Sequence, residues 1–156
     1  MKLFKNQKGF TLIELLVVIG ILAVLLAITL IAINPGRQFA QANNTQRASD
    51  VNAVLNAVHQ FMVDSRGVLP AGLVAGDADK PVSTAVGGTL AAFCTALVPT
   101  YIAALPTDPQ DGTTFVDCTD YATAYTISVS ATNNRITVEA PGTEIPPATI
   151  AVSVTR

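Results

Sequence analysis

The sequence predicts an α+β protein in which a long N-terminal helix packs on a small antiparallel sheet. Three observations predict this class: an apolar run near the N-terminus, an amphipathic stretch after it, and alternating apolar residues near the C-terminus. The chain has 156 residues, enough for one domain of ordinary size. We therefore expect one globular head on a helix whose first half is apolar.

The apolar run covers residues 15–33 and contains no charged side chain. As a helix it would span roughly 28 Å, close to the hydrocarbon thickness of a bilayer. The three lysines before it (Lys2, Lys5 and Lys8) favour a cytoplasmic N-terminus and export of the residues after the run. The run is longer than the apolar part of a cleaved secretory signal peptide, so conventional cleavage at its end is disfavoured. Residues 34–36 predict a kink, or a helix end with a restart capped by Asn34.

The second half of the helix is predicted over residues 34–66. Its apolar residues recur at helical spacing, at Val51, Val54, Leu55, Val58, Phe61 and Met62. We interpret this stripe as the face on which a sheet packs. Arg66 and Gly67 predict the helix end, with the glycine at C′. His59 lies at the edge of the stripe, and without nearby ligand partners it is interpreted as a boundary residue rather than a metal or catalytic site.

The head, residues 67–156, is predicted to hold an irregular connection, a short helix and three or four antiparallel strands. The connection covers residues 68–88 and the short helix covers 89–98, capped by Thr89 and stopped by Pro99. The strands are expected at 123–130, at 135–140 and around Ile150, Val152 and Val154. Residues 132–134 favour a hairpin because asparagine tolerates a positive φ.

Composition disfavours two classes of function. Without its three leading lysines the chain would have six basic residues against eleven acidic ones, a net charge of −5. No basic stripe is present to neutralise phosphates, so no direct nucleic-acid site is expected. The single histidine, with no Gly-rich phosphate loop and no Cys/His cluster at metal spacing, gives no candidate catalytic residues, and an enzyme is not expected.

Glu14 is the one carboxylate beside the apolar run, and two interpretations of it are open. An unpaired carboxylate in lipid costs free energy, so the side chain must be neutralised, hydrated or paired. It can extend to the membrane interface, as in an ordinary signal anchor. Alternatively, a cut between Gly9 and Phe10 creates an ammonium at Phe10, four residues before Glu14 on a helix, and supplies a cation within the chain or to a neighbouring chain. The physical argument alone does not decide between them.

Residues 8–15 (KGFTLIEL), followed by the long apolar run, resemble the class III signal sequence of type IV pilins and pseudopilins. The resemblance is close over residues 2–33 and general afterwards. It implies that residues 1–9 are a leader, that a prepilin peptidase cuts after Gly9, and that the amine of Phe10 is then N-methylated. It also implies that Glu14 neutralises the N-terminal amine of a neighbouring subunit, with residues 10–33 as the transmembrane and filament-core helix. Pro35 departs from the family, in which many helices kink inside the apolar half.

Cys94 and Cys118 form an even pair in the exported part, which favours a disulfide. Such a bridge would contribute roughly 3 kcal/mol to stability by the chain-entropy model. The alternative is two buried free thiols.

Residues 105–109 (LPTDP) resemble the turn before the sheet in major pseudopilins of type II secretion, which often have a calcium loop after it. Four acidic residues could supply oxygen ligands: Asp108, Asp111, Asp117 and Asp120. The aromatic-glycine pair usual after that turn is absent. We favour a polar surface loop held by the cysteine bridge, with no metal and no other cofactor, over calcium.

The resemblance implies a structural subunit of a type IV pilus-like filament, with other copies of the chain, a prepilin peptidase and methyltransferase, and an inner-membrane assembly platform as partners. Before processing it would be a single-pass membrane protein, and after assembly a cell-surface filament. One alternative is a major pseudopilin of a type II secretion or competence system. Another is a monomeric membrane-anchored binding protein that uses only the export signal.

Overall fold

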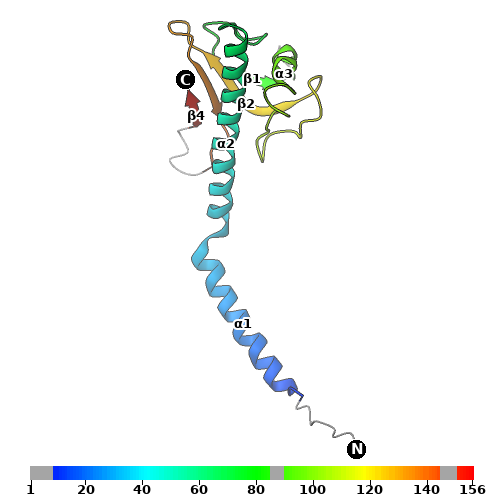
Figure 1. Cartoon of the computed structure of the whole chain (residues 1–156). Helices are drawn as coiled ribbons and strands as arrows, with labels where there is room; N and C mark the ends of the chain where they lie inside the picture. The colour runs from blue at the N-terminus through cyan, green and yellow to red at the C-terminus, as the bar shows by residue number, and fades with distance from the viewer. Residues whose placement is uncertain (1–8, 85–89, 145–150) are drawn as a thin grey trace, which may run out of the picture. The chain divides into compact units, whose positions relative to one another are not determined.

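The computed structural model describes residues 9–84, 90–144 and 151–156. Its elements are α1 (Leu12–Ile33), α2 (Pro35–Asp64), β1 (Lys80–Ser83), α3 (Ala91–Leu97), β2 (Ala122–Val129), β3 (Ile136–Ala140) and β4 (Val152–Thr155) (Figure 1). The α+β class is confirmed, with an antiparallel sheet whose strands all follow the two long helices α1 and α2. The chain divides into two compact units, one ending at Gln38 and the other running from Phe39 to Arg156.

The first unit contains α1 and the start of α2. Asn34 separates the two helices, with φ 48° and ψ 77° in the left-handed region that asparagine tolerates. Its side-chain Oδ1 accepts a hydrogen bond from the backbone N–H of Arg37 at 3.4 Å. Pro35, which has no N–H to leave unsatisfied, occupies the first position of α2. The predicted helix restart with Asn34 as N-cap is therefore confirmed.

In the second unit α2 contributes the predicted apolar stripe. Val51, Val54, Leu55 and Val58 are buried, and Phe61 and Met62 pack against the core while partly exposed. Burying each Val or Leu side chain contributes roughly 1.5–3 kcal/mol. Among the described residues every buried side chain lies beyond Phe39. The part from Phe39 to Arg156 thus contains a complete hydrophobic core of its own.

The end of α2 differs by one residue from the prediction. Arg66, not Gly67, adopts the left-handed C′ conformation, with φ 56°. The N–H of Gly67 donates to the carbonyl of Met62 at 2.7 Å, and the N–H of Arg66 donates to that of Val63 at 3.4 Å. This is the Schellman arrangement, in which two carbonyls of the last turn are satisfied. Gly67, with φ 87°, follows it and turns the chain away.

The sheet has the order β1-β2-β3-β4, with every neighbouring pair antiparallel. Alternate residues of β2 are buried, and β3 shows the same alternation, so one face of the sheet is apolar. Ile127 pairs with Val138, and both belong to the core cluster that includes the stripe of α2. Figure 1 shows the strands beside the C-terminal part of α2.

The predicted strands at 123–130 and 135–140 are present with shifts of one residue, and the third is β4. Asn134 adopts the expected positive φ, 54°, in the hairpin. Ile150 lies outside the described residues. The fourth strand, β1, corrects the prediction that residues 68–88 are irregular throughout. It is an edge strand, paired on one side only. Proline, which has no N–H to donate, is tolerated in such a strand but not in a central one.

The short helix α3 lies within the predicted range and ends before Pro99. Thr89, its predicted N-cap, lies outside the described residues. Phe93, Cys94 and Leu97 of α3 are buried in the core.

Candidate processing and assembly site

The junction between Gly9 and Phe10 is exposed backbone without secondary structure. Phe10 has 82% of its surface exposed. A Cβ built on Gly9 would have no atom of the described residues beyond its chain neighbours within 4 Å. The fold therefore does not require glycine at position 9, and the peptide bond after it is accessible to a peptidase.

The helix begins later than predicted, at Leu12 instead of Phe10. Thr11 is the N-cap, with φ −79° and ψ 152°, and its Oγ1 accepts a hydrogen bond from the N–H of Glu14 at 3.3 Å. In return Oε2 of Glu14 accepts from the N–H of Thr11 at 2.8 Å and from its hydroxyl at 2.7 Å. This reciprocal pair is a capping box. Phe10 is thus outside the helix, and the predicted i, i+4 helical relation between Phe10 and Glu14 is absent in the uncut chain.

The capping box changes the interpretation of Glu14. From the sequence, a cation was the partner considered for this carboxylate; in the uncut chain Thr11 already supplies two uncharged donors. Both bonds are made to Oε2, and no described residue donates a hydrogen bond to Oε1. The lone pairs of Oε1 are therefore free to accept from a further donor. The arrangement can hold the carboxylate in place while it accepts one more charged hydrogen bond, such as one from an ammonium.

The rest of α1 has no side chain buried within the chain. Its 22 residues extend roughly 33 Å at 1.5 Å per residue. It is the one helix among the described residues that is long and apolar enough to cross a membrane. The hydroxyl of Thr29 donates to the carbonyl of Leu26 at 2.9 Å, so this polar group is satisfied inside the helix. The surface of α1 suits lipid or other apolar helices.

Asp108, the first of the four acidic residues considered for a calcium loop, is buried, and both of its carboxylate oxygens accept hydrogen bonds within the chain. Oδ2 accepts from Nε of Arg47 at 2.6 Å, and Oδ1 accepts from Nη2 of Arg47 at 3.0 Å. Oδ1 also accepts from the N–H groups of Gln110 at 2.9 Å and Asp111 at 3.1 Å. Oδ1 thus accepts three bonds and Oδ2 one, and the guanidinium already neutralises this buried carboxylate, so the residue does not fit a calcium ligand.

The other three acidic residues do not join Asp108 in one metal site. Asp111 lies near it. A Cβ built on Gly142 would be 3.2 Å from Oδ2 of Asp111 and 3.3 Å from Oδ2 of Asp108. Asp117 instead accepts bonds from the N–H groups of Thr119 and Asp120. Among the described residues no group of three or more His, Cys, Asp or Glu side chains is placed to hold a metal ion. The loop without a metal stays the prediction, and this geometry lends no support to the calcium alternative.

Arg47 is the residue that the sequence analysis missed. Its side chain is fully buried, and Nη1 donates to Oε1 of Glu144 at 2.9 Å and to Oδ1 of Asn44 at 3.0 Å. The two carboxylates raise the pKa of Arg47 despite its burial, Asp108 having the larger effect. Burial raises the pKa of Asp108, but the bonds from Arg47 and two backbone N–H groups outweigh it and lower the pKa. A signal was present, because Arg47 lies four residues before Val51 and so continues the buried stripe.

The predicted disulfide between Cys94 and Cys118 is present and joins α3 to the loop before β2. His59 is half-buried at the edge of the stripe, as expected of a boundary residue.

Comparison with known families gives one match. Residues 4–30 match the prokaryotic N-terminal methylation motif, the class III signal peptide motif of type IV pilins and pseudopilins. The match covers the processing junction and most of α1. No curated protein and no solved structure matches the chain.

Proposed function

We propose that this chain, which carries the signal motif of type IV pilins and pseudopilins, is the structural subunit of a type IV pilus-like filament. A prepilin peptidase cuts it between Gly9 and Phe10, and the new amine of Phe10 is methylated. An inner-membrane assembly platform then moves the subunit from the membrane into a helical polymer on the cell surface. The first 9 residues are the leader, residues 10–33 form the membrane and filament-core helix, and residues 67–156 form the exposed head.

One observation carries this proposal: an exposed Gly9–Phe10 junction directly precedes a capped helix that buries none of its own side chains. An apolar surface of this size needs a cover, which is lipid before assembly and the same helix of other copies afterwards. Oε1 of Glu14 can then accept a hydrogen bond from the methylated ammonium group of Phe10 in a neighbouring copy. The pairing sets the stagger between adjacent helices, because each carboxylate is fixed by its Thr11.

Substitution of Glu14 tests the proposal. Glu14→Gln keeps a capping box, since glutamine also serves at this position, but removes the charge. We expect the variant to lose its leader normally and to be missing from filaments, with Glu14→Ala behaving the same way. The mass of the mature wild-type protein should report loss of the leader and one added methyl group. Normal surface abundance and function of both variants would instead indicate the monomeric anchored protein.

The major pseudopilin is the second candidate, and the turn at residues 105–109 favours it. That turn lies between α3 and β2 and is fixed to α2 through Asp108. The two candidates differ in filament length. Long fibres of this chain in sheared culture supernatants would favour the pilus, and their absence alongside a secretion or uptake defect would favour the pseudopilus.

A further inference from the structure

The basic residues of the exported part are concentrated at one place. From Arg37 onward the chain has six basic side chains, and two of them, Arg47 and Lys80, are held in ion pairs. Three of the other four, Arg66, Arg135 and Arg156, line a single cleft of about 550 Å³. None of these three forms an ion pair with another described residue. The residues that line the cleft include no acidic side chain, so the cleft is positive on an acidic protein.

The cleft lies between the end of α2 and the β2–β3 hairpin, and its interior is apolar. Met62 and Val63 line it, and Val63 has 78% of its surface exposed. The side chain of Arg156 donates from Nη1 to Oδ1 of Asn56 at 2.8 Å, which holds its guanidinium at the rim. A fitting occupant therefore has an apolar side chain flanked by carboxylates, since guanidinium groups bind carboxylates with two parallel hydrogen bonds.

The head itself carries a segment with this chemistry. Val116 has 80% of its surface exposed, and Asp117 and Asp120 beside it are exposed and form no ion pair with a described residue. The disulfide at Cys118 fixes the segment between the two acids. Oδ1 of Asp117 accepts from the N–H of Thr119 at 2.8 Å, and its bonds from Thr119 lower the pKa of Asp117. The segment is thus a fixed acidic protrusion with an apolar residue at its edge.

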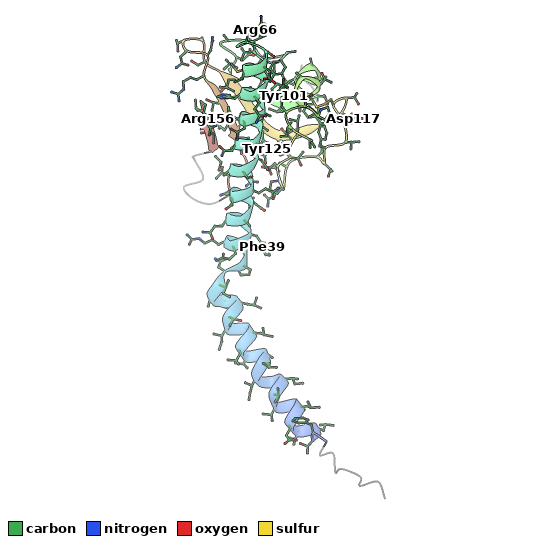
Figure 2. All side chains as sticks on the ribbon, in the orientation of Figure 1. Phe39, Arg66, Tyr101, Asp117, Tyr125 and Arg156 are labelled. Carbon is green, nitrogen blue, oxygen red and sulfur yellow. A yellow bond between two sulfur atoms is a disulfide. The ribbon has the colours of Figure 1, made fainter. Side chains whose placement is uncertain are left out.

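The cleft and the protrusion lie on different sides of the same head. Figure 2 shows Arg156 and Asp117 on opposite flanks of α2, with Arg66 at the end of the helix. One copy therefore cannot join its own two surfaces, but two copies side by side can. A contact between different surfaces of identical molecules repeats from copy to copy, and it builds an open helical polymer unless the rotation closes a ring.

We propose that the cleft lined by Arg66, Arg135 and Arg156 receives residues 116–120 of a second copy. Val116 contacts Met62 and Val63, while Asp117 and Asp120 pair with the arginines at the rim. The inference rests on the proposed function, in which copies of the chain polymerise through α1. The head contact adds a second, charge-dependent link between adjacent subunits.

The test uses two full-length charge-reversal variants in cells that assemble the filament. The first variant carries Arg66→Glu and Arg135→Glu, and the second carries Asp117→Lys and Asp120→Lys. Each alone opposes like charges at every head contact, and we expect roughly tenfold less filament in low salt, with partial recovery in high salt. Expressed together, the two variants again match opposite charges at each contact, and we expect wild-type yield.

The mixed sample also controls for folding, because two misfolded proteins would not restore each other. A milder variant, Asp117→Asn with Asp120→Asn, keeps one side-chain oxygen at each position and removes the two charges without reversing them. It should also lower the filament yield. Unchanged yield of the first variant, or a loss that co-expression does not repair, overturns the head contact, whether or not another ligand binds the cleft. Failure of the proposed function would look different, since then the wild-type chain itself would form no filament.

Discussion

Arg47 of α2 and Asp108 of the turn before β2 form a buried ion pair through two parallel hydrogen bonds, of 2.6 and 3.0 Å. The two residues are 61 positions apart, so the pair connects the helix to a distant loop. Glu144, after β3, joins the same guanidinium. One buried arginine thus positions three separate segments of the head.

Replacing Arg47 by Met should strongly destabilise the head. Removing one member of a buried pair leaves an uncompensated charge, which typically costs about 3–5 kcal/mol. The free energy of unfolding, measured by urea denaturation of residues 39–156, should fall by roughly that amount.

Two further variants control this measurement. Arg47→Met with Asp108→Asn removes the charges of the buried pair, and it should recover part of the loss because only the partly exposed carboxylate of Glu144 then lacks its cation. Arg135→Met changes an exposed arginine and should alter stability by less than about 0.5 kcal/mol. Equal stability of Arg47→Met and wild type would show that the pair contributes nothing.

The pH dependence of stability should separate Asp108 from Asp50. The pKa of Asp108 is lowered in the folded state, so its contribution to stability is present above the unfolded value of about 4 and is lost as the pH falls through the folded value. We expect Asp108→Asn to destabilise the head at pH 7, with the difference from wild type shrinking below about pH 4.

Asp50→Asn is the matched variant, because the pKa of Asp50 is shifted in the opposite direction to that of Asp108. Burial raises the pKa of Asp50, although the hydroxyl of Tyr125 donates to Oδ2 at 2.8 Å. The folded state therefore binds this proton more tightly than the unfolded state, so the ionised carboxylate contributes unfavourably to stability at pH 7. Asparagine keeps an acceptor for Tyr125, so Asp50→Asn should be neutral or stabilising at pH 7. Destabilisation of similar size in both variants would contradict the assignment.

Calcium should not affect the stability of the head. The four donors on Asp108 include a guanidinium, which already supplies the positive charge that a metal would bring to this turn. The melting temperature of residues 39–156 should be the same in calcium and in a chelator. A higher melting temperature in calcium would instead support the pseudopilin-type calcium loop. Asp111→Asn should then abolish this increase in melting temperature.

Much of the fold was predictable because it follows local rules. The apolar stripe from Val51 to Met62, the restart at Asn34 and the alternation in β3 each depend on periodicity or on one residue's backbone preference. Strand β1 was missed because Pro81 argues against a strand, and only pairing with β2 along the sheet edge makes it one. That information lies more than forty residues further along the chain.

A motif predicts the processing junction between Gly9 and Phe10, but the hydrogen bonds between Thr11 and Glu14 beside it were not predicted. A threonine three residues before a glutamate predicts a capping box, yet the charge of Glu14 alone directs attention to distant partners instead of Thr11. Arg47 was missed for another reason. A charged residue is expected on the polar side of a helix, and its burial depends on two carboxylates, Asp108 and Glu144, that the fold brings from elsewhere.

Thr11→Val should separate the two roles of Glu14. Valine has nearly the shape of threonine but neither accepts nor donates a side-chain hydrogen bond, so the start of α1 loses about 1 kcal/mol of capping. The charge of Glu14 and the backbone N–H of residue 11 are kept. We expect normal leader removal and filaments that assemble in lower yield, in contrast to the complete loss in Glu14→Gln. Filament content can be compared by immunoblotting of sheared fractions, and an equal loss in both variants would mean that position, not charge, is what assembly needs.

Gly9→Ala should block processing without changing the precursor. A methyl group at position 9 meets no atom of residues 9–84, 90–144 or 151–156 within 4 Å, chain neighbours aside, so this part of the fold offers no reason for glycine there. The reason must lie in the peptidase, whose site has to admit the backbone on both sides of the cut. We expect the variant to accumulate in the membrane fraction with its leader attached, as intact mass would show, while residues 39–156 keep their stability. Phe10→Ala is the matched change across the same bond; it leaves glycine in place and should still be cut. Normal cleavage of Gly9→Ala would move the cut site, or the requirement, away from this junction.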